Sequence, residues 1–250
     1  MLTIDLNCDL GESFGAWAMG DDTALMDFVS SINVACGFHA GDPSVIRKTV
    51  ETGLKKGVAI GAHPSFPDLQ GFGRREMQLS PTEIFDIVLY QIAALKGIVE
   101  AFGGTLHHVK PHGALYNQAA KQPEMATAIA KAIKAIDEKL IFYGLSGSFL
   151  ISEAEKIDLS TASEVFADRT YQPDGTLTPR SQPGALIKDT NKAVEQVLEL
   201  MTGSVTATNG TKVAIRADTL CIHGDGRNAL RFARQINQKL IEKGIKIQSR

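Results

Sequence analysis

Short apolar runs alternate with longer amphipathic runs along most of the chain, the pattern of a parallel sheet covered by helices. The short runs predict seven strands, and the last residues leave room for an eighth. The seven are Leu2 to Cys8, Ile32 to Cys36, Val58 to Ala62, Leu106 to Val109, Leu140 to Tyr143, Thr161 to Val165 and Thr219 to Ile222. We expect residues 1–250 to form one (β/α) barrel domain, because that length is typical of this fold.

Capping patterns mark where two of the helices begin. Asp42 precedes Pro43, and Ser80 precedes Pro81 with Glu83 completing a capping box. The predicted helices run from about Pro43 to Lys56, Pro81 to Phe102, Pro123 to Ile136, Asn191 to Met201 and Asn228 to Glu242. Two other segments, residues 65–78 and 171–186, are rich in Gly, Pro and Arg and are either binding loops or surface excursions.

Side chains alternate between the two faces of a strand, so each predicted strand has an apolar face and a small or polar one. In the first strand Asp5, Asn7 and Asp9 share the polar face. The corresponding faces of the second and third strands end in His39 and His63. Ionisable residues therefore gather where these strands end.

The stretch LHHVKPHGALYN, residues 106–117, carries three of the six histidines of the chain. By parity, His108, Lys110 and His112 share one face, and His107 lies on the other. The first three are expected to face the mouth of the barrel.

The last two strands end in the same way as the earlier ones. Glu164 and Asp168 are in phase after the sixth strand, and His223 and Asp225 are in phase after the seventh. Five of the six histidines thus lie at or just past a strand's C-terminal end. These ends converge on one mouth in a (β/α) barrel, so the sequence predicts one polar, histidine-rich site there.

A divalent metal ion is one candidate ligand of this site. Neutral imidazole and carboxylate groups bind zinc and related ions, and the candidate ligands are Asp9, His39 and His63, joined by His108 and His223. The spacing matches no local metal motif such as HExxH, but ligands at a barrel mouth need not be close in sequence.

Lys110 favours the other candidate, a negatively charged ligand. Its ammonium would lie ~6.6 Å from the His108 ring and repel the protonated form by roughly 2.5 kcal/mol at an effective dielectric of ~20, leaving that ring neutral at pH 7. Other candidate anion donors are the backbone N–H groups of Gly37, Gly41 and residues 42–44, and the side chains of Arg74, Arg169 and Arg180.

Composition and missing motifs exclude several classes of function. A formal net charge of −2 gives no field that would gather nucleic acid or an anionic membrane. No apolar run approaches the ~18 residues of a membrane span, so we expect a soluble, cytoplasmic protein. The sequence has no P-loop, no glycine-rich dinucleotide fingerprint and no GxSxG nucleophile elbow. Cys8, Cys36 and Cys221 are expected to be buried, reduced thiols.

Several long blocks, in order, resemble the LamB/YcsF family, described as the A subunits of bacterial 5-oxoprolinases. They are IDLNCDLGES, NVACGFHAGDP, GVAIGAHPSFPD, FGRREM, HVKPHGALYNQAA, EVFADRTYQPDGTLTPRSQPGALI and CIHGDG, and they span Ile4 to about Gly226. The resemblance implies a seven-stranded (β/α) barrel of the glycoside hydrolase/deacetylase type, similar to a TIM barrel. It also implies ATP-dependent opening of 5-oxo-L-proline to L-glutamate, with ATP as co-substrate, in a complex with subunits B and C.

For such a reaction we expect two groups of residues at the barrel mouth. Lys110, with His112 or His108, would stabilise phosphoryl or oxyanion charge, and Asp9, His39 or His63 would activate water or protonate the ring nitrogen. Arg169 would hold the substrate carboxylate. The remaining expected substrate-binding residues are Asn7, Glu12, Glu164, Asp168, His223 and Asp225. Two alternatives stay open: a metal-dependent, deacetylase-like amide hydrolase and a noncatalytic lactam-binding scaffold protein.

Overall fold

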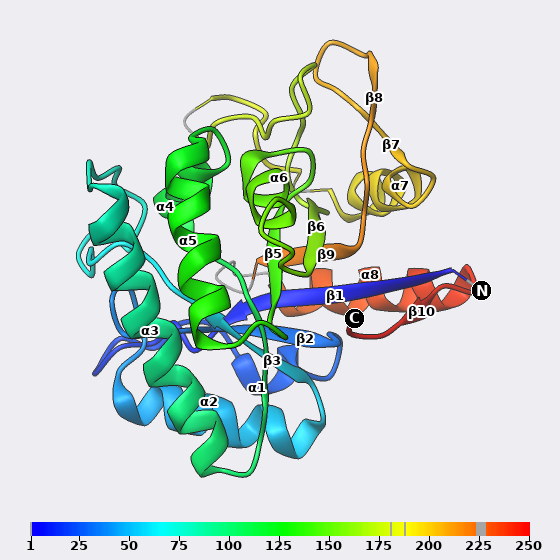
Figure 1. Cartoon of the computed structure of the whole chain (residues 1–250). Helices are drawn as coiled ribbons and strands as arrows, with labels where there is room; N and C mark the ends of the chain where they lie inside the picture. The colour runs from blue at the N-terminus through cyan, green and yellow to red at the C-terminus, as the bar shows by residue number, and fades with distance from the viewer. Residues whose placement is uncertain (1, 181, 188, 224–228) are drawn as a thin grey trace.

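The computed structural model describes residues 2–180, 182–187, 189–223 and 229–250, with the side chain of residue 223 excepted (Figure 1). Parallel strands form a closed barrel with helices outside it. The barrel strands are β1 (Thr3–Leu10), β2 (Ser31–Ala35), β3 (Ala59–His63), β4 (Leu106–Val109), β5 (Ile141–Leu145), β6 (Thr161–Phe166) and β9 (Thr219–His223).

Seven strands close the barrel in the described part of the chain, as predicted. Each strand pairs with the next in sequence, and β9 pairs with both β6 and β1, which completes the ring. An eighth strand, β10 (Lys246–Ile247), pairs with Thr3 and Ile4 at the start of β1. It lies outside the ring closure, and it brings the two ends of the chain side by side (Figure 1).

The helices begin where the capping patterns predict. The Asp42 carboxylate accepts from the backbone N–H groups of Ser44 and Val45, and Ser80 and Glu83 form a reciprocal capping box. The predicted helices correspond to α2 (Pro43–Lys56), α3 (Pro81–Ala101), α5 (Pro123–Ile136), α7 (Thr190–Leu200) and α8 (Ala229–Glu242). Residue 228, the predicted start of the last helix, lies outside the described residues.

Several short elements escaped prediction. They are α1 (Asp22–Leu25), α4 (Gly113–Ala119), α6 (Phe149–Glu155) and the hairpin of β7 (Ser204–Thr206) and β8 (Lys212–Ala214). A helix of two turns or fewer shows too little periodicity to stand out from a loop. Among the described residues, no helix is long and apolar enough to cross a membrane.

The two faces of each strand separate as alternation predicts. On the outer face, Gly53 of α2 lets that helix approach Ile32 and Ile60, because a Cβ there would lie 3.0 Å from the Ile32 side chain. On the inner face, the Asn33 amide donates to Asn7 Oδ1 at 2.8 Å. The three cysteines are buried free thiols, as expected.

Candidate functional site

A cavity of about 1020 Å³ opens at the C-terminal ends of the barrel strands. Six of the predicted catalytic and substrate-binding residues line it, together with two of the candidate anion donors, Arg74 and Arg180. The six are Asp9, Glu12, His63, Lys110, His112 and Arg169. The unassigned segment 171–186 also contributes to its wall, through Asp174, Thr176 and Arg180 among others. The structure thus brings together residues from most of the length of the chain.

Beneath the cavity, Asp5, Asn7, Asn33 and His108 form a buried polar layer, which we call the floor. Asp5 accepts from the hydroxyls of Ser31 and Thr219 at 2.8 and 2.6 Å. Asn7 donates to Thr219 Oγ1 at 2.7 Å and accepts from Asn33. These polar groups satisfy one another, which is the condition for a stable buried network.

His108 belongs to the floor, and its expected position at the barrel mouth is wrong. Its Nε2 donates to Asn33 Oδ1 at 2.8 Å, and the ring stacks on Tyr143 and packs directly against Gly61. Parity places His108 inside the barrel, but a strand rises only ~3.3 Å per residue, so this early position lies well below the mouth. Burial first, then His107 and Lys110, hold the pKa of His108 well below its usual value.

The ammonium of Lys110 is held between two carboxylates. Its Nζ lies 2.8 Å from Asp9 Oδ1 and 2.9 Å from Glu164 Oε1, and it also donates to Cys221 Sγ at 3.0 Å. Burial alone would lower the pKa of Lys110, but Asp9, Cys221 and Glu164 outweigh burial and raise the pKa well above its usual value. The two acids already neutralise the charge of Lys110, so the argument for an anion from an unbalanced lysine does not hold, and the role of Lys110 toward a ligand stays a prediction.

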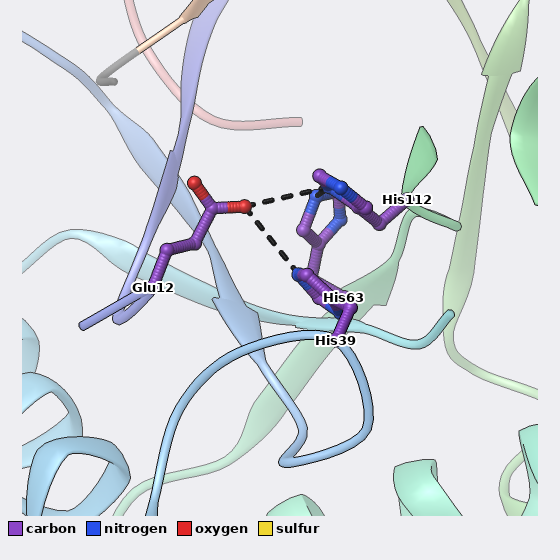
Figure 2. A group of neighbouring side chains, drawn as sticks. All are labelled: Glu12, His39, His63 and His112. Carbon is purple, nitrogen blue, oxygen red and sulfur yellow. Dashed lines mark hydrogen bonds and ion pairs between the residues drawn. The ribbon is translucent and has the colours of Figure 1, made fainter. Parts of the chain in front are cut away.

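Glu12, His39, His63 and His112 form a compact group that we call the histidine cluster (Figure 2). They come from the C-terminal ends of four neighbouring strands: Glu12 follows β1, His39 follows β2, His63 ends β3 and His112 follows β4. One ligand atom from each lies within 4.8 Å of all the others. The predicted metal set shares His39 and His63 with this cluster, but Glu12 stands where Asp9 was expected and His112 is added.

Glu12 Oε1 lies 3.4 Å from both His39 Nε2 and His112 Nδ1, and Figure 2 shows the three rings gathered beside this carboxylate. His112 Nδ1 is 2.9 Å from His63 Nε2. Burial, followed by neighbouring histidines, holds the pKa of His39 and of His112 well below the usual value. These two rings are therefore neutral at pH 7, the form in which imidazole binds a metal.

Segment 65–78, the other segment left unassigned by the sequence, packs against the histidine cluster. Phe72 has a positive φ of 55°, which is strained for a residue other than glycine, and its carbonyl accepts from His112 Nε2 at 2.9 Å. The Phe72 ring makes T-shaped contacts with the rings of His39 and His112. Gly73, also at positive φ, packs so closely that a Cβ would lie 2.9 Å from the His112 ring.

Arg169 also lines the cavity, and one of its guanidinium N–H groups has no acceptor among the described residues. Its Nη2 donates to the Thr178 carbonyl at 2.7 Å, but its buried Nε has no partner among the described residues. Burial first, then Arg180, lowers the pKa of Arg169 to about 10, so the side chain stays charged at pH 7. A buried, charged donor facing a cavity is suited to a carboxylate or phosphate.

The other predicted residues lie around this centre or outside the described part. Asn7 and Glu164 are buried in the barrel interior, and Asp168 precedes Arg169 without lining the cavity. The backbone of His223 pairs in register with Asp9, while the His223 side chain and Asp225 lie outside what the structure describes.

Two residues of the site escaped sequence reasoning. Asn33 donates to Asp9 Oδ1 at 2.8 Å, and the Tyr116 hydroxyl donates to Glu164 Oε2 at 2.7 Å. Asn33 sits on the polar face of its strand, so parity could have identified it. Tyr116 lies on the short helix α4, which gave no signal.

The chain is similar to known proteins over its whole length. Residues 4–250 match the sequence profile of the LamB/YcsF family. The chain belongs to this family. A relative from Brevibacillus brevis, named as the A subunit of 5-oxoprolinase, is 57% identical over 100% of this chain and 99% of its own length. The crystal structure of a lactam utilization protein from Thermus thermophilus superposes with a TM-score of 0.95 at 48% identity, covering 100% of both chains.

A more distant structure supports the fold class alone. A family 4 carbohydrate esterase from Streptomyces lividans superposes with a TM-score of 0.50 at 14% identity, over 98% of this chain and 91% of that one. The predicted barrel of the glycoside hydrolase/deacetylase type is confirmed for this member of the LamB/YcsF family.

Proposed function

We propose that this chain is the A component of an ATP-dependent 5-oxoprolinase. The complex would open 5-oxo-L-proline to L-glutamate while ATP is hydrolysed to ADP and phosphate, each reaction consuming one water. The observation that carries the proposal is 57% identity over the whole chain to a protein named as the A subunit of 5-oxoprolinase. The chain would act with subunits B and C in the cytoplasm, where its buried thiols would stay reduced.

The cavity supplies groups for both ends of the lactam. Arg169 would bind the carboxylate through the fork of its guanidinium, using the Nε that has no partner among the described residues. Asp9 would exchange protons with water and with the nitrogen of the lactam ring. Lys110 and Asn33 each donate to Asp9 Oδ1 at 2.8 Å, and Asp9 Oδ2 lies 3.3 Å from His63 Nε2. Lys110 would position Asp9, with its own charge already balanced.

ATP is required because an unstrained amide is a poor electrophile. Transfer of a phosphoryl group to the lactam oxygen would make the ring carbon more reactive toward water. The sequence contains no P-loop, so we assign ATP use to the assembled complex.

The test is turnover by the chain reconstituted with subunits B and C. We expect ADP and glutamate to appear in equal amounts, and only when both 5-oxoproline and ATP are present. Glutamate formed without ATP would instead favour the metal-dependent amide hydrolase. ATP hydrolysis and ring opening by B and C alone, with this chain only lowering the KM for 5-oxoproline, would favour the scaffold alternative.

Arg169→Lys tests the substrate-binding part of the proposal. Lysine keeps the charge but loses the planar fork, so we expect the KM for 5-oxoproline to rise by about 10- to 100-fold, the range for a charged hydrogen bond worth about 1.5–3 kcal/mol. Arg47→Lys is the matched control, because Arg47 lies on the outside of α2 and pairs with Glu51. Equal KM values for the two variants would contradict the role given to Arg169.

A further inference from the structure

We propose that the histidine cluster is a binding site for one divalent transition-metal ion of the zinc class, held by Glu12, His39, His63 and His112. The proposal that a metal binds here depends only on the geometry of these four residues. Only the ion's place beside the substrate rests on the proposed function, because Glu12, His63 and His112 line the cavity assigned to the lactam.

The contacts of His63 and His112 show which of their ring nitrogens carries the proton. His63 Nδ1 lies 2.6 Å from the Lys110 carbonyl oxygen, and His112 Nε2 lies 2.9 Å from the Phe72 carbonyl oxygen. A carbonyl oxygen only accepts, so each of these nitrogens carries the hydrogen. In a neutral imidazole the other nitrogen is then a bare acceptor.

With both rings in the neutral form, two bare nitrogens face each other at 2.9 Å inside the protein, and Asp9 Oδ2 adds an acceptor 3.3 Å from His63 Nε2. Two lone pairs at this distance repel unless a positive charge lies between or beside them. Glu12 Oε1 adds an acceptor 3.4 Å from His112 Nδ1, and His39 Nε2 lies 3.4 Å from that oxygen. The arrangement therefore presents several electron-pair donors to one point.

The separations match those of metal ligands. Bonds of about 2.0–2.1 Å in a tetrahedron place neighbouring ligand atoms about 3.3 Å apart. Three of the separations among the four ligand atoms are 2.9, 3.4 and 3.4 Å, close to that value, and all four atoms lie within 4.8 Å of one another. Three nitrogens and one carboxylate oxygen favour zinc and related transition metals, whereas Mg²⁺ and Ca²⁺ prefer oxygen ligands.

Backbone carbonyls orient two of the three rings, His63 and His112, as they do around known metal ions, while the buried Nδ1 of His39 has no partner among the described residues. A metal-binding histidine commonly donates its second N–H to a carbonyl or carboxylate, which fixes the ring. Phe72 provides that carbonyl for His112, and does so from a strained backbone conformation. Strain of this kind persists where the surrounding structure holds it, often at a ligand site.

The contact between His107 and His108 resembles the one between His63 and His112, but among the described residues it lacks a neighbouring carboxylate side chain. Their Nδ1 atoms lie 3.1 Å apart, while each Nε2 faces an oxygen acceptor. No carboxylate completes a group there: within the described ranges, only the histidine cluster brings three or more ligand atoms within 4.8 Å. His107 is also half-buried, outside the barrel interior.

The variants remove one ligand atom and keep the neighbouring contact. In His63→Asn the amide can still donate to the Lys110 carbonyl, and in His112→Gln it can still donate to the Phe72 carbonyl. Glu12→Gln removes the charge alone and serves if either histidine variant fails to fold. His107→Gln is the matched control, since it removes a histidine without touching the cluster.

The experiment titrates the untagged, metal-free full chain with Zn²⁺ in competition with a chromophoric chelator, without lactam, ATP or partner subunits. We expect one Zn²⁺ per chain for the unmodified protein and His107→Gln, and at least about tenfold weaker binding for each folded cluster variant. Co²⁺ should give the visible absorption of a tetrahedral site in the first two proteins alone.

Two results would overturn the proposal. One is a folded, unmodified chain that takes up no Zn²⁺, which would mean that a shared proton balances the cluster. The other is cluster variants that bind Zn²⁺ as tightly as the unmodified chain. Either result leaves the oxoprolinase proposal standing, because turnover of the reconstituted complex is measured separately.

Discussion

His108 and His112 lie four residues apart on the same parity, yet their surroundings are opposite in kind. His108 donates to an asparagine oxygen in the floor and stacks on Tyr143, although its Nδ1 also lies 3.1 Å from His107 Nδ1. His112 turns a bare nitrogen toward His63 and the Glu12 carboxylate, where every neighbour is also an acceptor. The donor of His108 thus has its acceptor within the protein, whereas the histidine cluster gathers acceptors that a positively charged ligand would satisfy. Loss of a floor contact should lower stability, and loss of a cluster contact should lower ligand binding.

The largest effect is expected at Lys110, which joins the floor to the cavity. Lys110→Met would leave the buried carboxylates of Asp9 and Glu164 without their shared cation, so the free energy of unfolding should fall by about 3–5 kcal/mol. Urea denaturation measures this change. Turnover of the reconstituted complex should also be lost, since Asp9 would no longer be held in place.

Lys56→Met is the matched control for this lysine. Lys56 pairs with Asp27 at the surface, and such pairs contribute only about 0–1 kcal/mol. Similar losses of stability in the two lysine variants would mean that the buried ion pairs do not organise the centre of the barrel.

An intermediate effect should separate the two histidines directly. His108→Leu leaves the buried Asn33 oxygen without its donor and should lower the unfolding free energy by about 1–3 kcal/mol, with Zn²⁺ affinity unchanged. His112→Gln should do the reverse, lowering Zn²⁺ affinity while the metal-free protein keeps its stability within about 1 kcal/mol. Urea denaturation and zinc titration are carried out on both variants. Equal changes in unfolding free energy and in Zn²⁺ affinity for the two variants would contradict the distinction between floor and cluster.

The smallest effect is expected at His107, whose side chain points away from the barrel interior. His107→Gln should change the unfolding free energy by no more than about 0.5 kcal/mol, the usual range for surface substitutions. A loss comparable to that of His108→Leu, measured in the same urea series, would show that the floor extends through the His107–His108 contact.

Strand alternation predicted most of the fold and the membership of the site. The polar positions Asp9, His63 and His112 all reach the same cavity, because parallel strands in a closed barrel end at one mouth. The ends of the helices followed from local capping chemistry at Asp42 and Ser80. These features depend on near neighbours in sequence, so one sequence is enough to read them.

Depth and charge balance could not be predicted in the same way. Parity placed His108 inside the barrel but did not show that Asn33 and Tyr143 hold it beneath the cavity. Lys110 looked like an unbalanced cation, because nothing in its own segment indicates that Asp9 and Glu164 approach it from other strands. The Phe72 carbonyl that fixes His112 belongs to an irregular loop, for which residue patterns carry little information.

The most direct test of the central claim is anomalous diffraction at the zinc absorption edge, from crystals of the full chain grown with one equivalent of Zn²⁺. We predict one dominant peak among Glu12, His39, His63 and His112, with bonds of about 2.0–2.2 Å to their ligand atoms. Full zinc occupancy elsewhere, with His63 and His112 still facing each other across an empty cluster, would contradict the account.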